Sequence, residues 1–433
     1  MMHRLVGTRL SVMMFLQFFV WGAWYVTVGN YMKTIQMSEA IDWAYTVGPL
    51  AAILSPFFLG MVADRFFATE RVLAVMHILG GVAIFLAPEA TQWRLSGPSV
   101  LLGALNLLGL RPEHAPFIGV LFLHMLFYMP TLGLTNTLAF HNLVDRERQF
   151  PIVRVFGTLG WIAANIVVSR ILHADETALP LQIAGGAAVL LGLYSLTLPH
   201  TPPPAAGKEV SVREILGLDS LALMKEPSFA VFITSSLLIC IPLAAYYAYA
   251  PVFVREAGLK DPAFKMSFGQ MSEVFFMVAM PLFFARLGVK KMLLVGMLAW
   301  VLRYILFGFG AGNHVFWMIT GGIVLHGICY DFFFVTGFIY VDRKASAEIR
   351  GQAQGFLVLV TQGIGLALGA QFAGGLIAEL TTQKAEVSVV DWYNFWMVCA
   401  FGAALVAAAF ALLFEDDVPK EEPAPVGEAE VAV

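Results

Sequence analysis

Charged residues are scarce in this sequence. Asp, Glu, Lys and Arg together make up 13% of the 433 residues, whereas a soluble globular chain carries about 25%. Hydrophobic residues make up 59%. Apolar runs of about 20 residues recur, and each is long enough to cross ~30 Å of hydrocarbon. The composition therefore excludes an ordinary soluble protein and predicts an all-α polytopic membrane protein.

Cysteine is rare, and the common catalytic motifs are missing. The three cysteines, Cys240, Cys329 and Cys399, lie in apolar stretches without paired spacing, which excludes a disulfide framework and a cysteine metal site. The sequence also lacks a Walker loop and the HExxH and GxSxG motifs. We therefore expect no metal, no cofactor, no nucleic-acid partner and no enzymatic activity. An intramembrane enzyme built on acidic residues is the least favoured alternative.

What the sequence does contain is a series of twelve apolar spans in two groups of six. Between the groups, residues 199–227 are proline-rich and charged, which predicts a cytoplasmic linker, with a surface helix near residues 212–224. The linker separates an N-terminal bundle (1–198) from a C-terminal bundle (228–415), and residues 416–433 are expected to form a disordered acidic tail. The predicted spans are 9–31, 43–63, 72–88, 115–141, 150–172, 180–198, 228–254, 265–285, 291–310, 314–341, 351–379 and 391–414.

Lysine and arginine are distributed unevenly between the two sides of these spans. About twice as many lie on the side of the chain termini as on the other side, which predicts that both termini are cytoplasmic. The two halves also share a short stretch of similar sequence, VDRERQFPIVR at 144–154 and VDRKASAEIR at 341–350, after the fourth and tenth spans. This similarity favours a transporter built from two parallel repeats.

A few polar groups lie well inside the spans. Glu273 and Asp331 are the two acidic residues near mid-membrane depth, where a charge costs about 2.5 kcal/mol or more and normally faces a cavity or a partner. Gln270 shares a helix face with Glu273 because it precedes it by three residues. The alternative is that both carboxyl groups are structural. His124 and Arg303 are expected to be structural, with Arg303 reaching the membrane interface.

Polar and aromatic stripes occur on the fifth span and on the tenth, which also carries Asp331. Arg154, Thr158 and Trp161 stand at helical spacing and share one face. This trio would suit a ligand that is flat at one end and hydroxylated at the other. His326 and Tyr330 form a similar pair, one turn apart. The alternatives are that Arg154 extends to the membrane interface and that the aromatic residues only pack.

The loop after the second span resembles a motif of the major facilitator superfamily. In GMVADRFFATER, the matching residues Gly60, Asp64, Arg65 and Arg71 imply a tight helix contact and a latch on the cytoplasmic side. Phe67 stands where a second glycine is often found. The resemblance implies the superfamily's fold of 12 transmembrane helices in two six-helix bundles.

Longer stretches resemble the bacterial nucleoside:proton symporter family from the first span to the twelfth. The family imports nucleosides with protons by alternating access, so the resemblance implies a transporter in the bacterial cytoplasmic membrane, in contact with lipid, nucleoside and protons. We expect a monomer. The stretches include LQFFVWGAWYVTVGNYM (16–32), MPTLGLTNT (129–137), RVFGTLGWI (154–162), QMSEVFFM (270–277), AWVLRYILF (299–307), YDFFFVTGFIYV (330–341) and AQGFLVLVTQGIG (353–365).

The same resemblance implies roles for particular residues. The carboxylate that the family needs for transport matches Asp331, and we expect its apolar surroundings to let it bind and release a proton near neutral pH. Glu273 is expected to bind substrate and to share the proton. The positions that match the family's substrate site are Arg154, Thr158, Trp161, Gln270 and Glu273.

Four positions depart from the family's pattern. Ala244 and Tyr247 stand where the family has a glutamine and an asparagine, and His326 and Tyr330 replace a tyrosine and a phenylalanine. Tyr247, His326 and Tyr330 are therefore added to the predicted binding residues. Because two amides are lost, a proton symporter for a sugar or another polyhydroxylated solute remains the alternative, followed by a non-transporting sensor.

Overall fold

The computed structural model describes residues 2–58, 66–203, 218–313, 315–346, 348–384 and 387–416. Gly60, Asp64 and Arg65 of the predicted loop motif, about half of the linker (204–217) and nearly all of the acidic tail therefore lie outside the described residues. Arg71, the fourth residue of that motif, lies in the first turn of a long helix that begins at Thr69.

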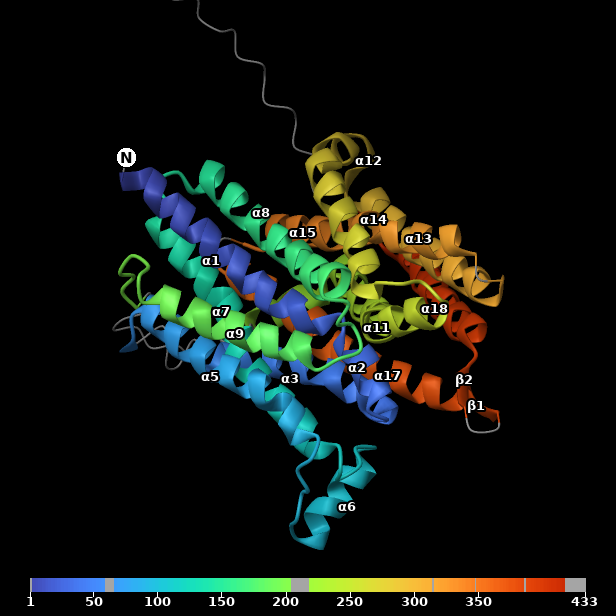
Figure 1. Cartoon of the computed structure of the whole chain (residues 1–433). Coiled ribbons are helices and arrows are strands. Elements are labelled where there is room, and N and C mark those ends of the chain that lie inside the picture. Colours follow the sequence, from blue (N-terminus) through green and yellow to red (C-terminus); the bar gives the residue numbers. More distant parts are fainter. Residues whose placement is uncertain are drawn as a thin grey trace, which may run out of the picture.

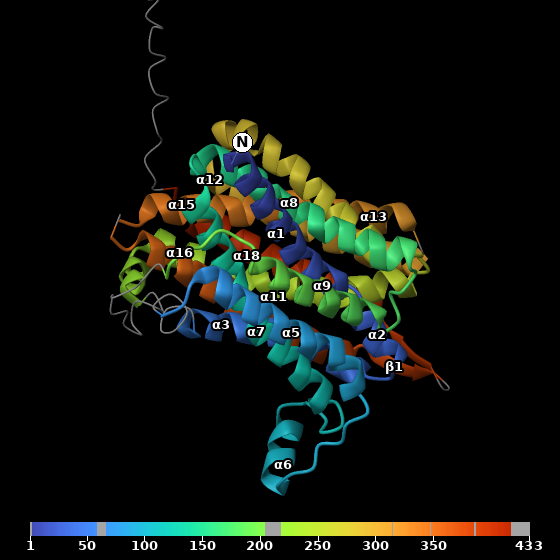
Figure 2. The same cartoon turned by 60° about the vertical axis from the view of Figure 1, so that its left-hand side comes forward.

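The N-terminal half consists of helices joined by short connections (Figure 1). Its membrane-length elements are α1 (Met2–Tyr25), which continues as α2 (Val28–Thr34), α3 (Ile41–Phe58), α5 (Thr69–Ala90), α7 (Ala115–Asn142), α8 (Arg146–Asn165), which continues as the π-helical segment η3 (Ile166–Ile171), and α9 (Leu179–Ser195). Two short elements complete it, η1 (Ser38–Ala40) and α6 (Ser99–Leu107), and α6 stands away from the bundle (Figures 1 and 2).

The C-terminal half is also helical, apart from one β-hairpin. Its elements are η4 (Leu218–Lys225), α11 (Pro227–Glu256), α12 (Pro262–Asn313), α13 (Phe316–Val324), α14 (His326–Tyr330), η5 (Asp331–Val335), α15 (Thr336–Lys344), α16 (Arg350–Val358), η6 (Leu359–Gly365), α17 (Leu366–Glu379), β1 (Thr381–Lys384), β2 (Val387–Val390) and α18 (Trp392–Leu413). The two strands pair antiparallel, with Thr381 opposite Val390.

The helices account for the twelve predicted spans. Within the described residues, 9 helices are long and apolar enough to cross a membrane. One of them, α12, is two helices, because Gly288 adopts a positive φ of 67° there and breaks the helix. The shorter α3 and α9 complete the set. Of the predicted linker helix (212–224), residues 212–217 lie outside the described residues, and the rest belongs to the 3₁₀ helix Leu218–Lys225. The β-hairpin was not predicted.

Glycine lets α1 and α8 cross at very close range. A Cβ added at Gly160 of α8 would lie 2.0 Å from the Phe15 carbonyl oxygen of α1, and one at Gly22 of α1 would lie 3.0 Å from the Trp161 Cα. Because membrane helices gain little from the hydrophobic effect when they associate, close backbone packing of this kind holds them together. The crossing fixes the position of Trp161 on α8.

The expectation that Arg303 reaches the membrane interface is wrong. The side chain is fully buried in the C-terminal half. Its Nε donates a hydrogen bond to the Gly322 carbonyl at 3.1 Å, and its guanidinium lies over the Tyr246 ring, 4.2 Å from the ring centroid. The aromatic face and the carbonyl attract the cation, so Arg303 is held inside the bundle.

The two ends of the bundle differ in how the halves meet. We call the end that carries the start of α1 and the end of α18 the terminus end, and the opposite end the hairpin end (Figures 1 and 2). At the hairpin end, ion pairs join the two halves: Lys33 with Glu256, and Arg255 with Glu176. In addition, the Asn30 Nδ2 donates to the Pro251 carbonyl at 3.3 Å.

Asp261 is the centre of a further contact between the halves at the hairpin end. Its carboxylate accepts from Arg170 at 2.9 Å and pairs with His173 Nδ1 at 3.0 Å. Burial raises the pKa of Asp261, but the hydrogen bonds from His173 and Arg170 outweigh burial and hold the pKa below its usual range. The contacts of Asp261 therefore stabilise the closed hairpin end at neutral pH. This stabilisation is lost as the pH falls through the lowered pKa of Asp261.

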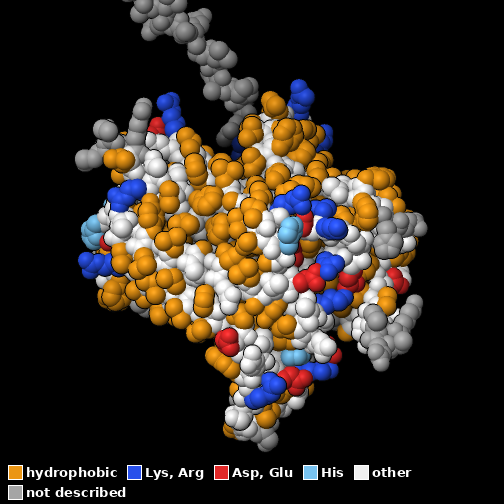
Figure 3. Space-filling model, viewed as in Figure 1, with side chains coloured by type: hydrophobic (Ala, Val, Ile, Leu, Met, Phe, Trp, Pro, Cys, Tyr) orange, Lys and Arg blue, Asp and Glu red, His pale blue; other side chains and the backbone are white. Residues whose placement is uncertain are grey.

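The face of the bundle seen in Figure 3 is rich in apolar side chains. In the space-filling view, hydrophobic side chains cover much of the face shown and charged side chains gather in groups (Figure 3). This is the pattern expected for a flank that meets lipid.

The glycine at the α1–α8 crossing gives a first prediction. Gly160→Ala forces the Phe15 backbone to move, and overpacking of this kind costs about 1–3 kcal/mol. We expect a lower melting temperature for the variant in detergent. Gly186→Ala in α9 is the matched control, because a Cβ there meets nothing within 4 Å. Equal melting of Gly160→Ala and the wild-type protein would contradict the packing argument.

The contacts of Asp261 give a second prediction. Asp261→Asn weakens closure of the hairpin end, and since an exposed charge pair contributes about 0.2–1 kcal/mol, opening should become roughly two- to fivefold more frequent. Val252→Cys provides the readout, because Val252 is buried against Gly29 of the other half and the native cysteines are buried. We expect faster maleimide labelling in Asp261→Asn.

The control for this experiment is Asp391→Asn. Asp391 lies at the same end, but it caps α18 by accepting from the Asn394 backbone and belongs to one half only. If Asp261→Asn and Asp391→Asn label at the same rate, the contacts of Asp261 do not hold the hairpin end closed.

Candidate functional site

A cavity of about 150 Å³ lies between the two halves, near the middle of the long helices. Residues of α1 and α8 form one side, and residues of α11, α12, α14, η6 and α17 form the other. The lining residues are Phe18, Trp21, Tyr25, Arg154, Thr158, Trp161, Tyr247, Gln270, Glu273, His326, Tyr330, Gln362 and Leu366.

All eight residues that the sequence predicted for substrate binding line this cavity. The helical stripe on α8 faces Gln270 and Glu273 on α12, with Tyr247, His326 and Tyr330 beside them. Ala244 is not among the lining residues; it is buried, and it packs against Gly369 of α17. The structure thus brings the predicted residues together, and their role in binding stays a prediction.

Arg154 and Glu273 place opposite charges on the two sides of the cavity. The Arg154 guanidinium lies over the Phe18 ring, 4.3 Å from its centroid, and interacts electrostatically with Glu273 across the cavity. Glu273 also lies 3.8 Å from Nε2 of His326. A polar ligand between the two halves would therefore meet a cation from one half and a carboxyl group from the other.

A stack of side chains fixes the ring of His326. Tyr246 lies against His326, with ring centroids 5.4 Å apart and an angle of 18° between the planes, and the Arg303 guanidinium also lies over the Tyr246 ring. His326 is buried, and its Nδ1 has no hydrogen-bond partner among the described residues.

Asp331 lies behind the cavity and does not line it. The side chain is fully buried, and both carboxyl oxygens lack a hydrogen-bond partner within the described parts of the chain. Asp331 begins the π-helical segment η5, a kind of irregularity that often occurs at functional sites. Its electrostatic neighbour is Glu273, so the cavity and Asp331 are linked through that residue.

Aromatic rings close the cavity on the side of the hairpin end. Tyr25 of the N-terminal half meets Tyr247 of the C-terminal half at 6.3 Å and Trp161 at 6.2 Å between centroids. Tyr25 is buried, whereas Arg154, which is the α8 lining residue nearest the terminus end, is exposed. The cavity is therefore accessible from the terminus end.

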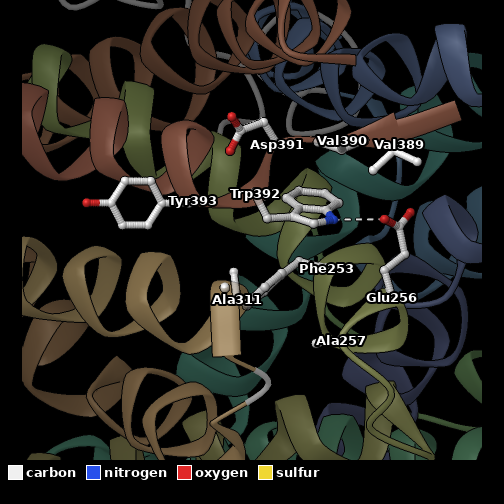
Figure 4. Close-up of a pocket in the computed structure, with 10 residues that line it drawn as sticks. Phe253, Glu256, Ala257, Ala311, Val389, Val390, Asp391, Trp392 and Tyr393 are labelled. Carbon is white, nitrogen blue, oxygen red and sulfur yellow. Dashed lines mark hydrogen bonds between the residues drawn. The ribbon is translucent and has the colours of Figure 1, made fainter. Parts of the chain in front are cut away.

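A second, larger cavity of about 300 Å³ lies at the hairpin end. Its lining residues all come from the C-terminal half. Figure 4 shows the Trp392 indole directed at the Glu256 carboxylate, with the side chains of Asp391 and Tyr393 turned away. Trp392 Nε1 donates to Glu256 at 2.8 Å, and Glu256 also pairs with Lys33. Because these groups already have partners, the central cavity is the better candidate site.

Sequence reasoning missed several residues of the central cavity. Phe18, Tyr25 and Leu366 are apolar or aromatic residues in apolar spans, so no signal separated them from packing residues. Gln362 is different: it is a polar side chain in the apolar stretch LVTQGIG, and its position inside a span was a usable signal. The expected absence of a metal and of a cofactor stays a prediction.

Similar proteins cover almost the whole chain. The putative nucleoside transporter YegT of Escherichia coli is 38% identical over 419 residues, which is 94% of this chain and 93% of that protein. The nucleoside permease NupG of Escherichia coli is 31% identical over 425 residues, covering 94% of this chain and 95% of that protein. The relatives are thus matched from end to end.

Solved structures show the same fold. A crystal structure of a mutant of the nucleoside transporter NupG matches with a TM-score of 0.83 and 29% identity, over 95% of this chain and 100% of that one. The D-xylose-proton symporter matches with a TM-score of 0.68 at 12% identity, over 94% of this chain and 98% of that one, which shows the fold alone. The fold is the predicted major facilitator fold.

The family model described as nucleoside H⁺ symporter matches residues 5–108 and 94–418. These ranges contain every residue that lines the central cavity. The chain therefore belongs to the nucleoside H⁺ symporter family.

Proposed function

We propose that this protein imports nucleosides together with protons across the bacterial cytoplasmic membrane by alternating access. The observation that carries the proposal is the central cavity, in which Arg154 of one half faces Gln270 and Glu273 of the other. Family membership supports the same conclusion. The excess of lysine and arginine favours a cytoplasmic position for the terminus end, and in that orientation the cavity would be accessible from the inside.

The substrate would bridge the two halves. Arg154 and Glu273 offer a donor and an acceptor for the ribose hydroxyls, and Trp161 and Tyr330 offer aromatic faces for the base. Because these groups belong to different halves, a bound nucleoside brings the halves together. Binding energy would then favour the movement that exchanges access between the two sides.

The proton would be bound by the pair of acidic residues. Glu273 touches the cavity and Asp331 lies behind it, and the two carboxyl groups interact electrostatically. Two acids whose charges interact do not readily ionise together, so their protonation is coupled. A substrate that contacts Glu273 therefore changes the proton affinity of the two acidic residues. In this way substrate binding is coupled to proton binding.

A proton symporter for a sugar or another polyhydroxylated solute is the second candidate function. The observation in its favour concerns α11. Tyr247 is the α11 residue that lines the cavity, whereas Ala244 packs against α17. A tyrosine hydroxyl is one polar group, whereas an amide supplies donors and an acceptor side by side. The same transport assay decides between the two functions.

The deciding experiment is uptake of labelled uridine and adenosine into proteoliposomes, with xylose as the sugar. We expect nucleosides to accumulate when an inward proton gradient is imposed and to equilibrate only when it is collapsed. Accumulation of xylose alone would select the second function. Binding of a nucleoside without any flux would show a sensor and would overturn the proposal.

The coupling role of Asp331 is tested by Asp331→Asn. The amide keeps the shape of the side chain but does not release a proton, so we expect gradient-driven accumulation to be lost. Nucleoside exchange between the two sides of the vesicle should persist. Asp391→Asn, outside the cavity, serves as the control. Full accumulation by Asp331→Asn would refute the role of this residue.

A further inference from the structure

Gln362 is a polar residue of the central cavity that takes part neither in the proposed contacts to the substrate nor in the proposed proton binding. It lies in η6, a π-helical segment that precedes α17 in the same span. Its side chain lines the cavity and is half-buried. Within the described residues, the Gln362 amide has no hydrogen-bond partner, although an amide offers both donors and an acceptor.

The residues beside Gln362 hold its backbone in place. A Cβ on Gly363 would lie 2.7 Å from Ile53 of α3, and one on Gly365 would lie 2.8 Å from Cys240 of α11. The Thr361 hydroxyl donates to the Leu357 carbonyl at 2.7 Å. Since α3 and α11 are packed against η6 on these sides, Gln362 is left to face the cavity. A side chain presented from a fixed backbone is suited to selective recognition.

Most of the other polar groups of the cavity offer a ligand different chemistry. Arg154 only donates, the ionised form of Glu273 only accepts, and Tyr247 brings a ring with one hydroxyl. Gln362 and Gln270 both offer an acceptor and a donor side by side, and Gln270 stands one helical turn before Glu273, which is proposed to contact the ribose. An acceptor beside a donor is complementary to the edge of a nucleobase, which presents a carbonyl or ring nitrogen beside an N–H group, and glutamine pairs with adenine in this way in protein–DNA complexes.

We propose that Gln362 is a specificity-determining residue that reads the hydrogen-bonding edge of the nucleobase. The inference rests on the proposed nucleoside transport and names which part of the substrate this residue recognises. The carboxamide accepts from the base N–H and donates to the neighbouring carbonyl or ring nitrogen. A 180° turn of the amide exchanges the two groups, so a lactam edge such as that of uracil and an amino edge such as that of adenine both pair with it.

The test compares uridine with 3-methyluridine as competitors of labelled uridine uptake in proteoliposomes. The added methyl group removes the N–H that Gln362 would accept from. In the wild-type protein we expect 3-methyluridine to compete roughly tenfold more weakly than uridine, in line with the loss of one or two paired hydrogen bonds. In Gln362→Met, which keeps the length of the side chain, we expect the two compounds to compete equally.

The control variant is Gln354→Met, a glutamine of the same span that donates to the Phe338 carbonyl and lies outside the cavity. It should retain the wild-type discrimination. A second variant, Gln362→Glu, has two acceptors and no donor when ionised. In this variant we expect uridine to compete roughly tenfold more weakly than in the wild-type protein. Guanosine, which has two neighbouring N–H donors, should compete as well as it does in the wild-type protein.

The outcomes separate the inference from the proposed function. If the wild-type protein takes up uridine and Gln362→Met still prefers uridine over 3-methyluridine, the inference is overturned and nucleoside transport stands. If adenosine alone is a substrate, the same comparison is made with N6,N6-dimethyladenosine. If the wild-type protein takes up no nucleoside, the proposed function fails and the inference fails with it.

Discussion

The bilayer core offers no hydrogen bonds, and the rest of this structure follows from that constraint. Every spanning segment is helical because backbone groups must find partners within the chain. Ionisable side chains must likewise lie where a partner or a cavity compensates for lost hydration. Arg154 and Glu273 meet this condition at the interface between the halves, and Arg303 meets it against Tyr246. The cavity between the halves is therefore where ionisable groups from both halves come together.

Much of the site was predictable because residues on one helix keep fixed positions relative to each other. The spacing of Arg154, Thr158 and Trp161 predicted a shared face, and all three line one cavity. Gln270 and Glu273 were predicted in the same way. The spacing did not show that these two helices face each other. That information came from the resemblance to a family, which already contains the tertiary arrangement.

The parts that were not predicted depend on contacts between distant segments. Arg170, in the last turn of η3, and Asp261, in the loop before α12, are 91 positions apart, and no periodic pattern in the sequence relates two such residues. Arg303 was predicted at the membrane interface because it lies near the end of its span. The contact of its guanidinium with the Tyr246 ring holds it inside the bundle instead. Gln362 was visible as a polar residue in an apolar stretch, but only the packing of η6 against α3 and α11 shows which way it faces.

The ion pairs at the hairpin end have a consequence for the response of the protein to salt. The Arg170 and Arg255 side chains are 59% and 49% exposed, so dissolved ions screen these pairs over a Debye length of about 10 Å at 0.1 M ionic strength. The buried Glu273 and Asp331 are screened much less. The salinity on the hairpin side thus changes the balance between the two access states, while the chemistry of the cavity stays the same.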